Sequence, residues 1–267
     1  MYVSVLNEEG APVADLGPSD FVVREDNSAR EVLTVRSADE PMQIALLVDN
    51  SQAAEPYVRD YREAITAFVT AMTSGEPGAR NDVAIITVAE RPTVNTDYTT
   101  NQQQLVKGAQ RIFAMPGSGS YMLDGILETS TGILKRRTAR PVIVALATAG
   151  PELSDRPYTQ VLERLQLSGA SMHIVTIGGP VSQQRDVAIV FSQGTASSGG
   201  RYDDLLAGTA LTGKLKQVAA ELTHQYRVTY ARPDSLIPPE RVTVSTPRPG
   251  LTARGISIIP DREQVNR

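Results

Sequence analysis

The sequence predicts an α/β fold: a doubly wound, mostly parallel sheet, to which the two chain ends add a small β domain. In residues 41–224, short apolar runs alternate with segments whose apolar residues recur every three or four positions. This alternation is typical of parallel strands joined by helices that cover both faces of the sheet. Residues 1–40 and 225–267 contain strand formers without a helical period. Because chain ends often lie close together, we expect these two segments to pack as one β domain, with the α/β domain inserted between them. Two separate β appendages are the alternative.

The composition limits the classes of function. The chain has 267 residues, 41% of them hydrophobic, so it can bury a sizeable core. A net charge of -4 gives no electrostatic reason to expect a nucleic-acid partner. Without cysteine, the chain has neither disulfides nor thiolate metal ligands. No apolar run reaches the roughly 18 residues of a membrane span, and no signal peptide is visible.

Both end segments are expected to be β-rich, because strand formers alternate there with turn residues. The first segment is expected to hold strands at residues 2–6, 21–23 and 32–35, with turns at 7–10 and 25–28. The last segment is expected to hold strands at residues 226–230, 242–244 and 251–259, with a proline-rich loop at 232–239 and a turn at 247–250.

Between the end segments, residues 42–48 form the first strand of the sheet. Six of these seven residues are apolar, as in a strand that is buried on both faces. In the helix that follows, Pro56 suits the first turn and apolar residues keep a helical spacing up to Met72, before a turn at 75–78. The other strands are expected at residues 83–88, 93–99, 141–148 and 172–177, with a short one after the turn at 199–202. The other helices are expected at residues 105–112 (capped by Asn101), 123–134, 155–165, 187–191 and 211–222.

The first strand of the sheet ends in Asp49, Asn50 and Ser51, three short side chains that carry oxygen. Open α/β sheets bind their ligands at the carboxyl ends of the strands. We therefore expect the ligand-binding site at this edge of the sheet.

Six stretches, taken in order and spacing, resemble one family. They are GAPVADL (10–16), DFVVRED (20–26), IALLVDNS (44–51), GSYMLD (119–124), GGRY (199–202) and ELTHQYRVTY (221–230). The chain is similar to the von Willebrand factor type A domain, and most of all to the bacterial group in which β segments flank that domain. The resemblance covers nearly the whole chain. It implies a Rossmann-like sheet, a role in protein binding or adhesion, and export from a bacterial cell, either secreted or periplasmic.

The resemblance also implies where a metal would bind. In the family, three loops hold a divalent cation through the pattern Asp-x-Ser-x-Ser, a threonine before a helix, and an aspartate after the next strand. Asp49 and Ser51 match the first loop, and Ser120 stands at the threonine position. Ala53 replaces the second serine, however, and Ala149 replaces the aspartate.

This departure leaves one carboxylate where the family pattern has two. Magnesium prefers a near-octahedral set of oxygen ligands, so we expect a degenerate metal-ion-dependent adhesion site that holds no metal. The ligand-binding residues would be Asp49, Asn50, Ser51 and Ser120. Retained magnesium is the alternative, with Glu152 or Asp155 supplying a carboxylate from the following loop. No other cofactor is expected.

A purely structural role for the same residues stays open. Asp49 and Ser51 would then hydrogen-bond the backbone of their own loop. Ser120 would cap the following helix, and Asp124 would face the positive end of that helix dipole.

Other candidate chemistry is weak. The loop Gly117-Ser118-Gly119-Ser120 lacks the lysine of a P-loop, and the chain has no Gly-x-Ser-x-Gly nucleophile elbow. We expect His173 to be a satisfied core or sheet-face residue and His224 to stabilise a helix end. The basic cluster Lys135-Arg136-Arg137 with Arg140 is expected to be a solvated helix end; a docking patch for an acidic partner is the alternative.

Together these features predict a non-enzymatic protein-binding or adhesion module. Its ligand would be a protein or a surface polymer that contacts the carboxyl edge of the sheet. The alternative is a structural or assembly protein that pairs through its terminal β segments, because exposed strand edges recruit partner strands. An enzyme is the third reading, and no spacing in the sequence supports it. The sequence does not predict the oligomeric state.

Overall fold

The computed structural model describes residues 1–75, 80–179, 184–232 and 239–257. Its centre is a six-stranded sheet in the order β10-β9-β8-β5-β6-β7, in which all neighbours are parallel except β6 and β7. The strands are β5 (Gln43–Val48), β6 (Asp82–Thr87), β7 (Thr93–Thr99), β8 (Pro141–Thr148), β9 (Ser171–Ile177) and β10 (Tyr202–Leu205). The predicted fold class is therefore confirmed.

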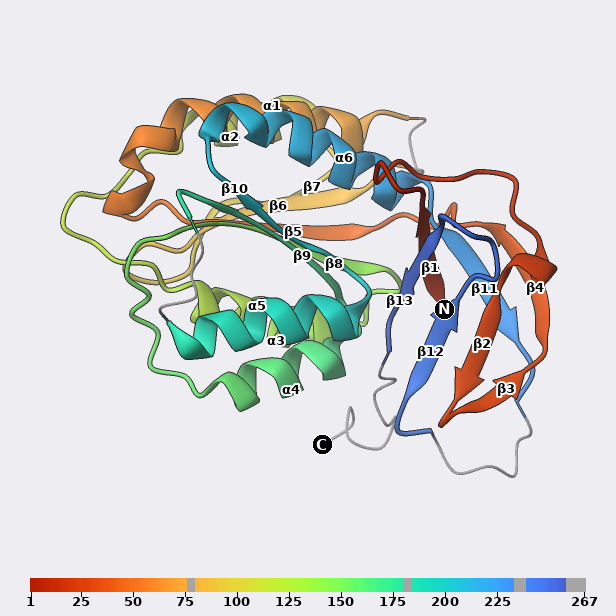
Figure 1. The fold of residues 1–267 in the computed structure, drawn as a ribbon. Helices are drawn as coiled ribbons and strands as arrows, with labels where there is room; N and C mark the ends of the chain where they lie inside the picture. Colours follow the sequence, from red (N-terminus) through yellow and green to blue (C-terminus); the bar gives the residue numbers. More distant parts are fainter. Residues whose placement is uncertain (76–79, 180–183, 233–238, 258–267) are drawn as a thin grey trace.

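Helices cover both faces of this sheet, as Figure 1 shows. One face carries α1 (Val58–Thr73), α2 (Gln102–Gln110) and α6 (Leu211–Thr223), with the short helices η2 (Gln52–Tyr57) and η4 (Gly208–Ala210). The other face carries α3 (Met122–Arg136), α4 (Tyr158–Ser168) and α5 (Arg185–Ser198). None of the helices in the described part of the chain has the length and apolar character needed to cross a membrane.

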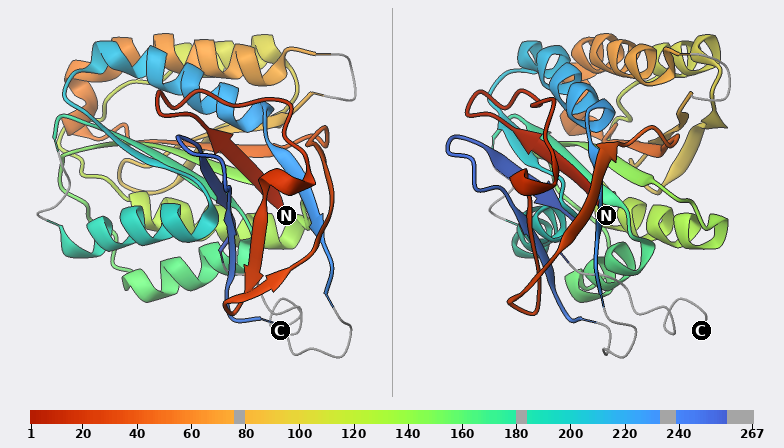
Figure 2. Two further views of the ribbon diagram at one scale, coloured as in Figure 1. Left: turned by 45° about the vertical axis from the view of Figure 1, so that its right-hand side comes forward. Right: turned by 90° about the vertical axis from the view of Figure 1, so that its right-hand side faces the viewer.

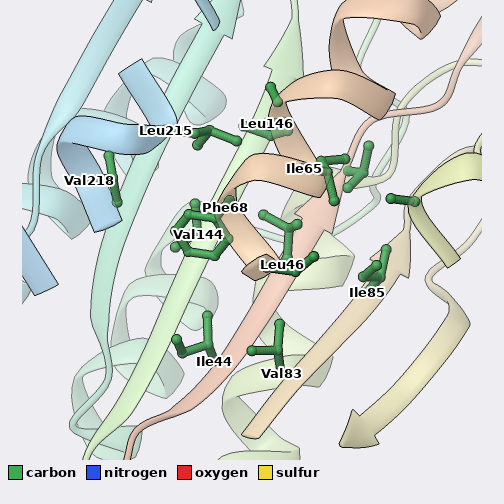
Figure 3. Packing of buried hydrophobic residues seen from close by; sticks show 14 of the residues in the cluster. Ile44, Leu46, Ile65, Phe68, Val83, Ile85, Val144, Leu146, Leu215 and Val218 are labelled. Atoms are coloured by element: carbon green, nitrogen blue, oxygen red, sulfur yellow. The ribbon is translucent and has the colours of Figure 1, made fainter. Parts of the chain in front are cut away.

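The core confirms the expectation that the first strand of the sheet is buried on both faces. Every residue of β8 and all but the first of β5 are buried. Figure 3 shows Phe68 of α1 lying over Leu46 and Val144 of these two strands, and all three belong to one hydrophobic cluster. Residues of the two strands that point the other way pack in a second cluster against α3, α4 and α5. A strand buried on both faces has to be apolar along its length, as the sequence indicated.

The strand order reverses between β5 and β8. From β5 the chain moves through α1 and α2 on one face before it returns through α3 on the other face to enter β8. In doubly wound sheets, a crevice opens outside the carboxyl ends of the two strands at such a switch point. The fold thus places the predicted site where this architecture binds ligands.

The two chain ends share antiparallel sheets. One has the order β13-β1-β11-β4 and the other has the order β12-β2-β3, with a hydrophobic cluster between them. Figure 2 shows the amino-terminal strands, in red, beside the carboxyl-terminal strands, in dark blue. The strands are β1 (Tyr2–Leu6), β2 (Val22–Glu25), β3 (Ser28–Arg30), β4 (Val32–Ser37), β11 (Tyr226–Tyr230), β12 (Val242–Ser245) and β13 (Thr252–Gly255); η1 (Pro18–Asp20) precedes β2. The chain ends therefore form one β domain, which lies at the amino ends of the parallel strands, opposite the carboxyl ends of β5 and β8 (Figure 1).

Some element bounds differ from the sequence prediction. The helix expected at residues 187–191 is the longer α5, because its second half is built from small and polar residues that carry no apolar period. It ends at Gly199, which takes the left-handed conformation (φ 75°). The last strand ends at Gly255 rather than at residue 259, and residues 258 and 259 lie outside the described residues. Parts of the expected turn at 75–78 and loop at 232–239 also lie outside them.

Arg140 is the clearest correction. The sequence placed it in a solvated basic cluster, but it is only 4% exposed. Its guanidinium donates to the carbonyl oxygens of Ala38, Glu40 and Leu222, at 2.9, 3.0 and 2.7 Å, and to Oε1 of Gln225 at 2.9 Å. These acceptors lie on the two chain segments that cross between the β domain and the α/β domain. A guanidinium suits this position because it offers five donors in a fixed plane.

We predict that Arg140→Ala destabilises the protein by about 3 kcal/mol or more, because it leaves several buried carbonyl groups without a donor. Urea unfolding measures the loss. Lys135→Ala is the matched control, since Lys135 belongs to the same basic cluster and is exposed. Its loss is expected to cost about 0.5 kcal/mol or less. Equal stabilities of the two variants would contradict the role of Arg140 at the crossing.

His173 lies in the core, as expected, but it is not satisfied. The side chain is fully buried on β9, and neither ring nitrogen has a hydrogen-bond partner in the described structure. Burial lowers the pKa of His173 to about 4; Glu221 and Asp203 oppose the shift, and Arg254 and Arg201 add to it. His224 lies at the end of α6, where the sequence placed it; it is exposed, and its Nδ1 lies 2.7 Å from the carbonyl oxygen of Ala220.

The buried His173 predicts acid sensitivity. Between its ordinary pKa of 6.5 and the folded-state pKa of about 4, the unfolded chain binds the proton more tightly. The contribution of neutral His173 to the unfolding free energy is therefore fully present above about pH 7. It is lost as the pH falls towards 4, by about 3 kcal/mol in total. We expect His173→Leu to flatten the dependence of unfolding free energy on pH in this window. Parallel curves for the variant and the native protein would refute this account.

Candidate functional site

Asp49 lies at the centre of the switch-point crevice and is fully buried. Its Oδ1 accepts a hydrogen bond from the backbone of Ser51 at 2.9 Å. Its Oδ2 accepts from the backbone and the hydroxyl of Thr148, the last residue of β8, at 3.1 and 2.5 Å. Oδ1 thus fixes the loop that carries Asp49, and Oδ2 joins the carboxyl ends of β5 and β8.

Asn50 connects three loops. Its side chain donates to the carbonyl oxygen of Phe113 at 3.2 Å and accepts from the backbone of Ala89 at 3.0 Å. Its own carbonyl oxygen accepts from the backbone of Met115 at 2.8 Å. The side-chain amide expected to face a ligand is therefore engaged in holding the segment between α2 and α3 against the carboxyl edge.

Ser51 and Ser120 contribute two buried hydroxyl groups; among the described residues that of Ser51 has no hydrogen-bond partner, and that of Ser120 has none of regular geometry. Ser120 does not cap α3, which begins after Tyr121; instead, its backbone pairs with the loop after β8. Beneath them the hydroxyl of Tyr61 is also buried and unpartnered. Burial raises the pKa of Tyr61 well above its usual value, and the charge of Asp49 adds to the shift. The negative potential of Asp49 therefore reaches Tyr61 in the core.

The two replaced positions bring no further oxygen. Ala149 is exposed at the end of β8, and Gly150 follows it. A Cβ at Gly150 would lie 2.5 Å from the Cβ of Ala53, so the first and third loops pack closely against each other. In the described parts of the chain, no three His, Cys, Asp or Glu side chains are grouped so that they could hold a metal ion.

Glu152 caps α3 from another loop. Its carboxylate accepts from the backbone of Met122 and Leu123, at 3.0 and 3.2 Å, and from the hydroxyl of Ser154. The Ser154 hydroxyl in turn accepts from the backbone of Asp124 at 3.0 Å. Burial raises the pKa of Glu152, and these hydrogen bonds oppose the shift. The sequence singled out Glu152 as a substitute metal ligand, and the structure shows it bound to a helix instead.

The loop that carries Glu152 is held on both sides. The Gln184 side chain accepts from the Glu152 backbone and donates to the carbonyl oxygen of Gly150, both at 2.8 Å. Arg156 forms an ion pair with Asp124 at 3.1 Å, which joins this loop to the first turn of α3. Asp155, the other carboxylate considered, is exposed.

Sequence reasoning missed the apolar character of this edge. Five large hydrophobic side chains are exposed in the described residues: Leu33, Val94, Phe113, Leu153 and Leu206. Phe113, Leu153 and Leu206 lie on loops at the carboxyl edge of the sheet, and Val94 pairs with Ile86 near the end of β6. No periodic pattern marks single apolar residues in loops, so only the fold brings them to one edge.

Comparison with known proteins supports the architecture. The family profile for the von Willebrand factor type A domain matches residues 43–194, which is more than half of the chain. No curated protein matches. The matched residues 43–194 contain strands β5 to β9 and the loops at their carboxyl ends.

Solved structures resemble the chain in fold at low identity. A von Willebrand factor type A protein from Catenulispora acidiphila aligns over 100% of this chain and 75% of its own, at 12% identity and a TM-score of 0.54. The vWF domain of the type V pili tip protein Mfa5 from Porphyromonas gingivalis aligns over 70% of this chain and 96% of its own, at 9% identity and a TM-score of 0.54. Proximal thread matrix protein 1 from the mussel byssus, with a zinc-occupied MIDAS motif, aligns over 74% of this chain and 50% of its own, at 11% identity and a TM-score of 0.57.

Identities this low show the shared fold alone, whereas the family profile matches the sequence itself. The resemblance stated from the sequence is thereby confirmed. Domains of this type are typically interaction or adhesion modules. The profile match, the strand order and the position of Asp49 agree, and the chain belongs to the von Willebrand factor type A domain family.

Proposed function

We propose that this protein is a non-enzymatic binding module of adhesion type, secreted or periplasmic, that engages a protein or surface polymer through the carboxyl edge of its sheet without a metal ion. The observation that carries the proposal is that Phe113, Leu153 and Leu206 are all exposed on loops at that edge. Exposed apolar area on one face of a molecule is typical of interaction surfaces.

Phe113 and Leu153 are presented on fixed backbone. The carbonyl oxygen of Phe113 accepts from Asn50, and that of the preceding Ile112 accepts from Nε of Arg62 at 2.9 Å. The backbone of Leu153 donates to the carbonyl oxygen of Ser120 at 2.7 Å. A partner therefore loses little free energy in ordering these two loops, which favours affinity.

The crevice fits a magnesium ion poorly. A hard dication needs several oxygen ligands in a near-octahedral array. Here Asp49 is the single carboxylate at the centre, both of its oxygens already accept hydrogen bonds, and Ser51 and Ser120 add only neutral hydroxyls. Asp49, Asn50, Ser51 and Ser120 then shape the edge, and recognition rests on the loops that they organise.

The second candidate, assembly through the terminal β segments, has one observation in its favour. Leu33 is 50% exposed on β4, which is an edge strand of its sheet. An exposed edge strand is a template for pairing with another chain. Leu33→Lys would impair this mode and spare binding at the carboxyl edge.

We predict that calorimetric titration with magnesium or manganese gives no binding heat for the native protein, and that EDTA leaves its melting temperature unchanged. The double variant Ala53→Ser, Ala149→Asp restores the missing hydroxyl and carboxylate and is expected to bind either ion measurably. Heat of binding in the native protein would show that the edge retains a metal site.

We predict that a photo-crosslinking residue at position 113 or 153 captures a specific partner from the protein's native surroundings, whereas the same residue at position 33 does not. With that partner purified, Phe113→Ala combined with Leu153→Ala should weaken binding about 10- to 100-fold, because exposed anchor residues carry much of the binding energy. Both side chains are exposed, so the fold should be retained. Crosslinking at position 33 alone would favour assembly through the β domain.

A further inference from the structure

The amino terminus of α3 is an anion-binding position that the chain fills by itself. Helix amino termini attract carboxylates because their first backbone N–H groups have no partner within the helix. In α3, a helix of 15 residues, the first three of these groups belong to Met122, Leu123 and Asp124. All three donate to side chains of the loop after β8: two to Glu152 and one to Ser154.

A second observation points to the same position. The hydroxyl of Ser120, only 4% exposed, has no hydrogen-bond partner of regular geometry, yet it lies near the Glu152 carboxylate and acts to lower its pKa. The backbone of Ser120 accepts from Leu153 and donates to the carbonyl oxygen of Pro151, at 2.7 and 2.8 Å. The loop of Ser120, which the sequence aligns with the second metal-binding loop of the family, thus binds the residues on either side of Glu152.

The geometry points to Glu152 as a built-in carboxylate ligand: it occupies the anion position at the amino terminus of α3, so that the edge excludes acidic groups of a partner and selects apolar ones. The placement of Glu152 at the helix end is independent of the proposed function. The consequence for the choice of partner rests on the proposed function.

Acidic groups of a partner are excluded for two reasons: the charge of Glu152 repels them, and the N–H donors at the start of α3 are already occupied. A second carboxylate would meet the charge of Glu152, and the N–H groups of the first turn of α3 are already taken. Like charges brought together at an interface suppress unsuitable partners. Leu153, the residue after Glu152, is 50% exposed, and a Cβ at Gly119 would come within 2.6 Å of it. The backbone that places the carboxylate inward therefore also holds an apolar side chain outward.

The first experiment titrates the full chain with acetate at constant ionic strength and follows the backbone amides of residues 122–124 by NMR. The native protein should show no saturable shift, because Glu152 fills the position. Glu152→Ala should show saturable shifts at these amides and a rise in melting temperature with acetate, and neither with acetamide. Asp155→Ala, which removes an exposed carboxylate from the same loop, should behave as the native protein does. A saturable native response, or none in Glu152→Ala, would overturn the assignment.

A second variant covers the case in which Glu152→Ala fails to fold. Glu152→Gln keeps an oxygen acceptor and removes the charge, and hydrogen bonds to a charged acceptor are roughly twice as strong as neutral ones. Hydrogen exchange of the amides of Met122 and Leu123 should be at least about tenfold faster in this variant than in the native protein. Exchange at the native rate would show that the carboxylate charge contributes nothing at the helix end.

The partner class is tested with a library of random decapeptides displayed on phage. Peptides that bind the native protein and are lost on the variant Phe113→Ala, Leu153→Ala should be rich in apolar residues and poor in Asp and Glu. The Glu152→Ala variant should select acidic peptides as well. Enrichment of acidic peptides by the native protein would overturn the exclusion. Peptides that bind equally to the double variant would count against the proposed function, and the acetate result would still decide the role of Glu152.

Discussion

The burial of β5 and β8 on both faces is the constraint on which the rest of this structure depends. Strands packed between two helical layers carry apolar side chains along their whole length. Polar groups can then gather only at the two strand ends, where loops leave the core. The two ends of these strands accordingly hold two polar clusters in the described part of the chain, one around Arg140 and one around Asp49.

The two centres solve different problems. At the amino ends, the chain crosses twice between domains, and Arg140 supplies donors to carbonyl groups that no sheet or helix satisfies. At the carboxyl ends, Asp49 and Glu152 supply acceptors to N–H groups of neighbouring loops and of α3. In this chain, the carboxylates near the position of the family's cation site form hydrogen bonds within the protein itself. In the function that we propose, a partner contacts the exposed apolar side chains of the surrounding loops.

The sequence allowed the fold and the centre of the site to be predicted, because both follow from local patterns. Apolar runs and helical spacing located the strands and most helices, and the oxygen-bearing residues after the first strand located the crevice. The full length of α5 was missed because Ser and Thr hydroxyls in its second half satisfy carbonyl groups of the preceding turn, as Thr195 does with Phe191, and leave no apolar period. Arg140 and Glu152 were misjudged because the backbone groups that they bind lie 29 to 102 residues away along the chain, so no spacing reveals them.

By itself, the sequence determined the family, the order of strands and helices, and the presence of alanine at positions 53 and 149, where the resemblance implies oxygen ligands, since each of these is a property of neighbouring residues. Only the tertiary structure decided that Asp49 bonds to Thr148, that Glu152 fills the end of α3, and that Phe113 and Leu153 share one edge. The physical reason is that hydrogen bonds and exposure depend on which distant segments of the chain come into contact. In this protein, the reversal of strand order between β5 and β8 brings the loops after these strands together.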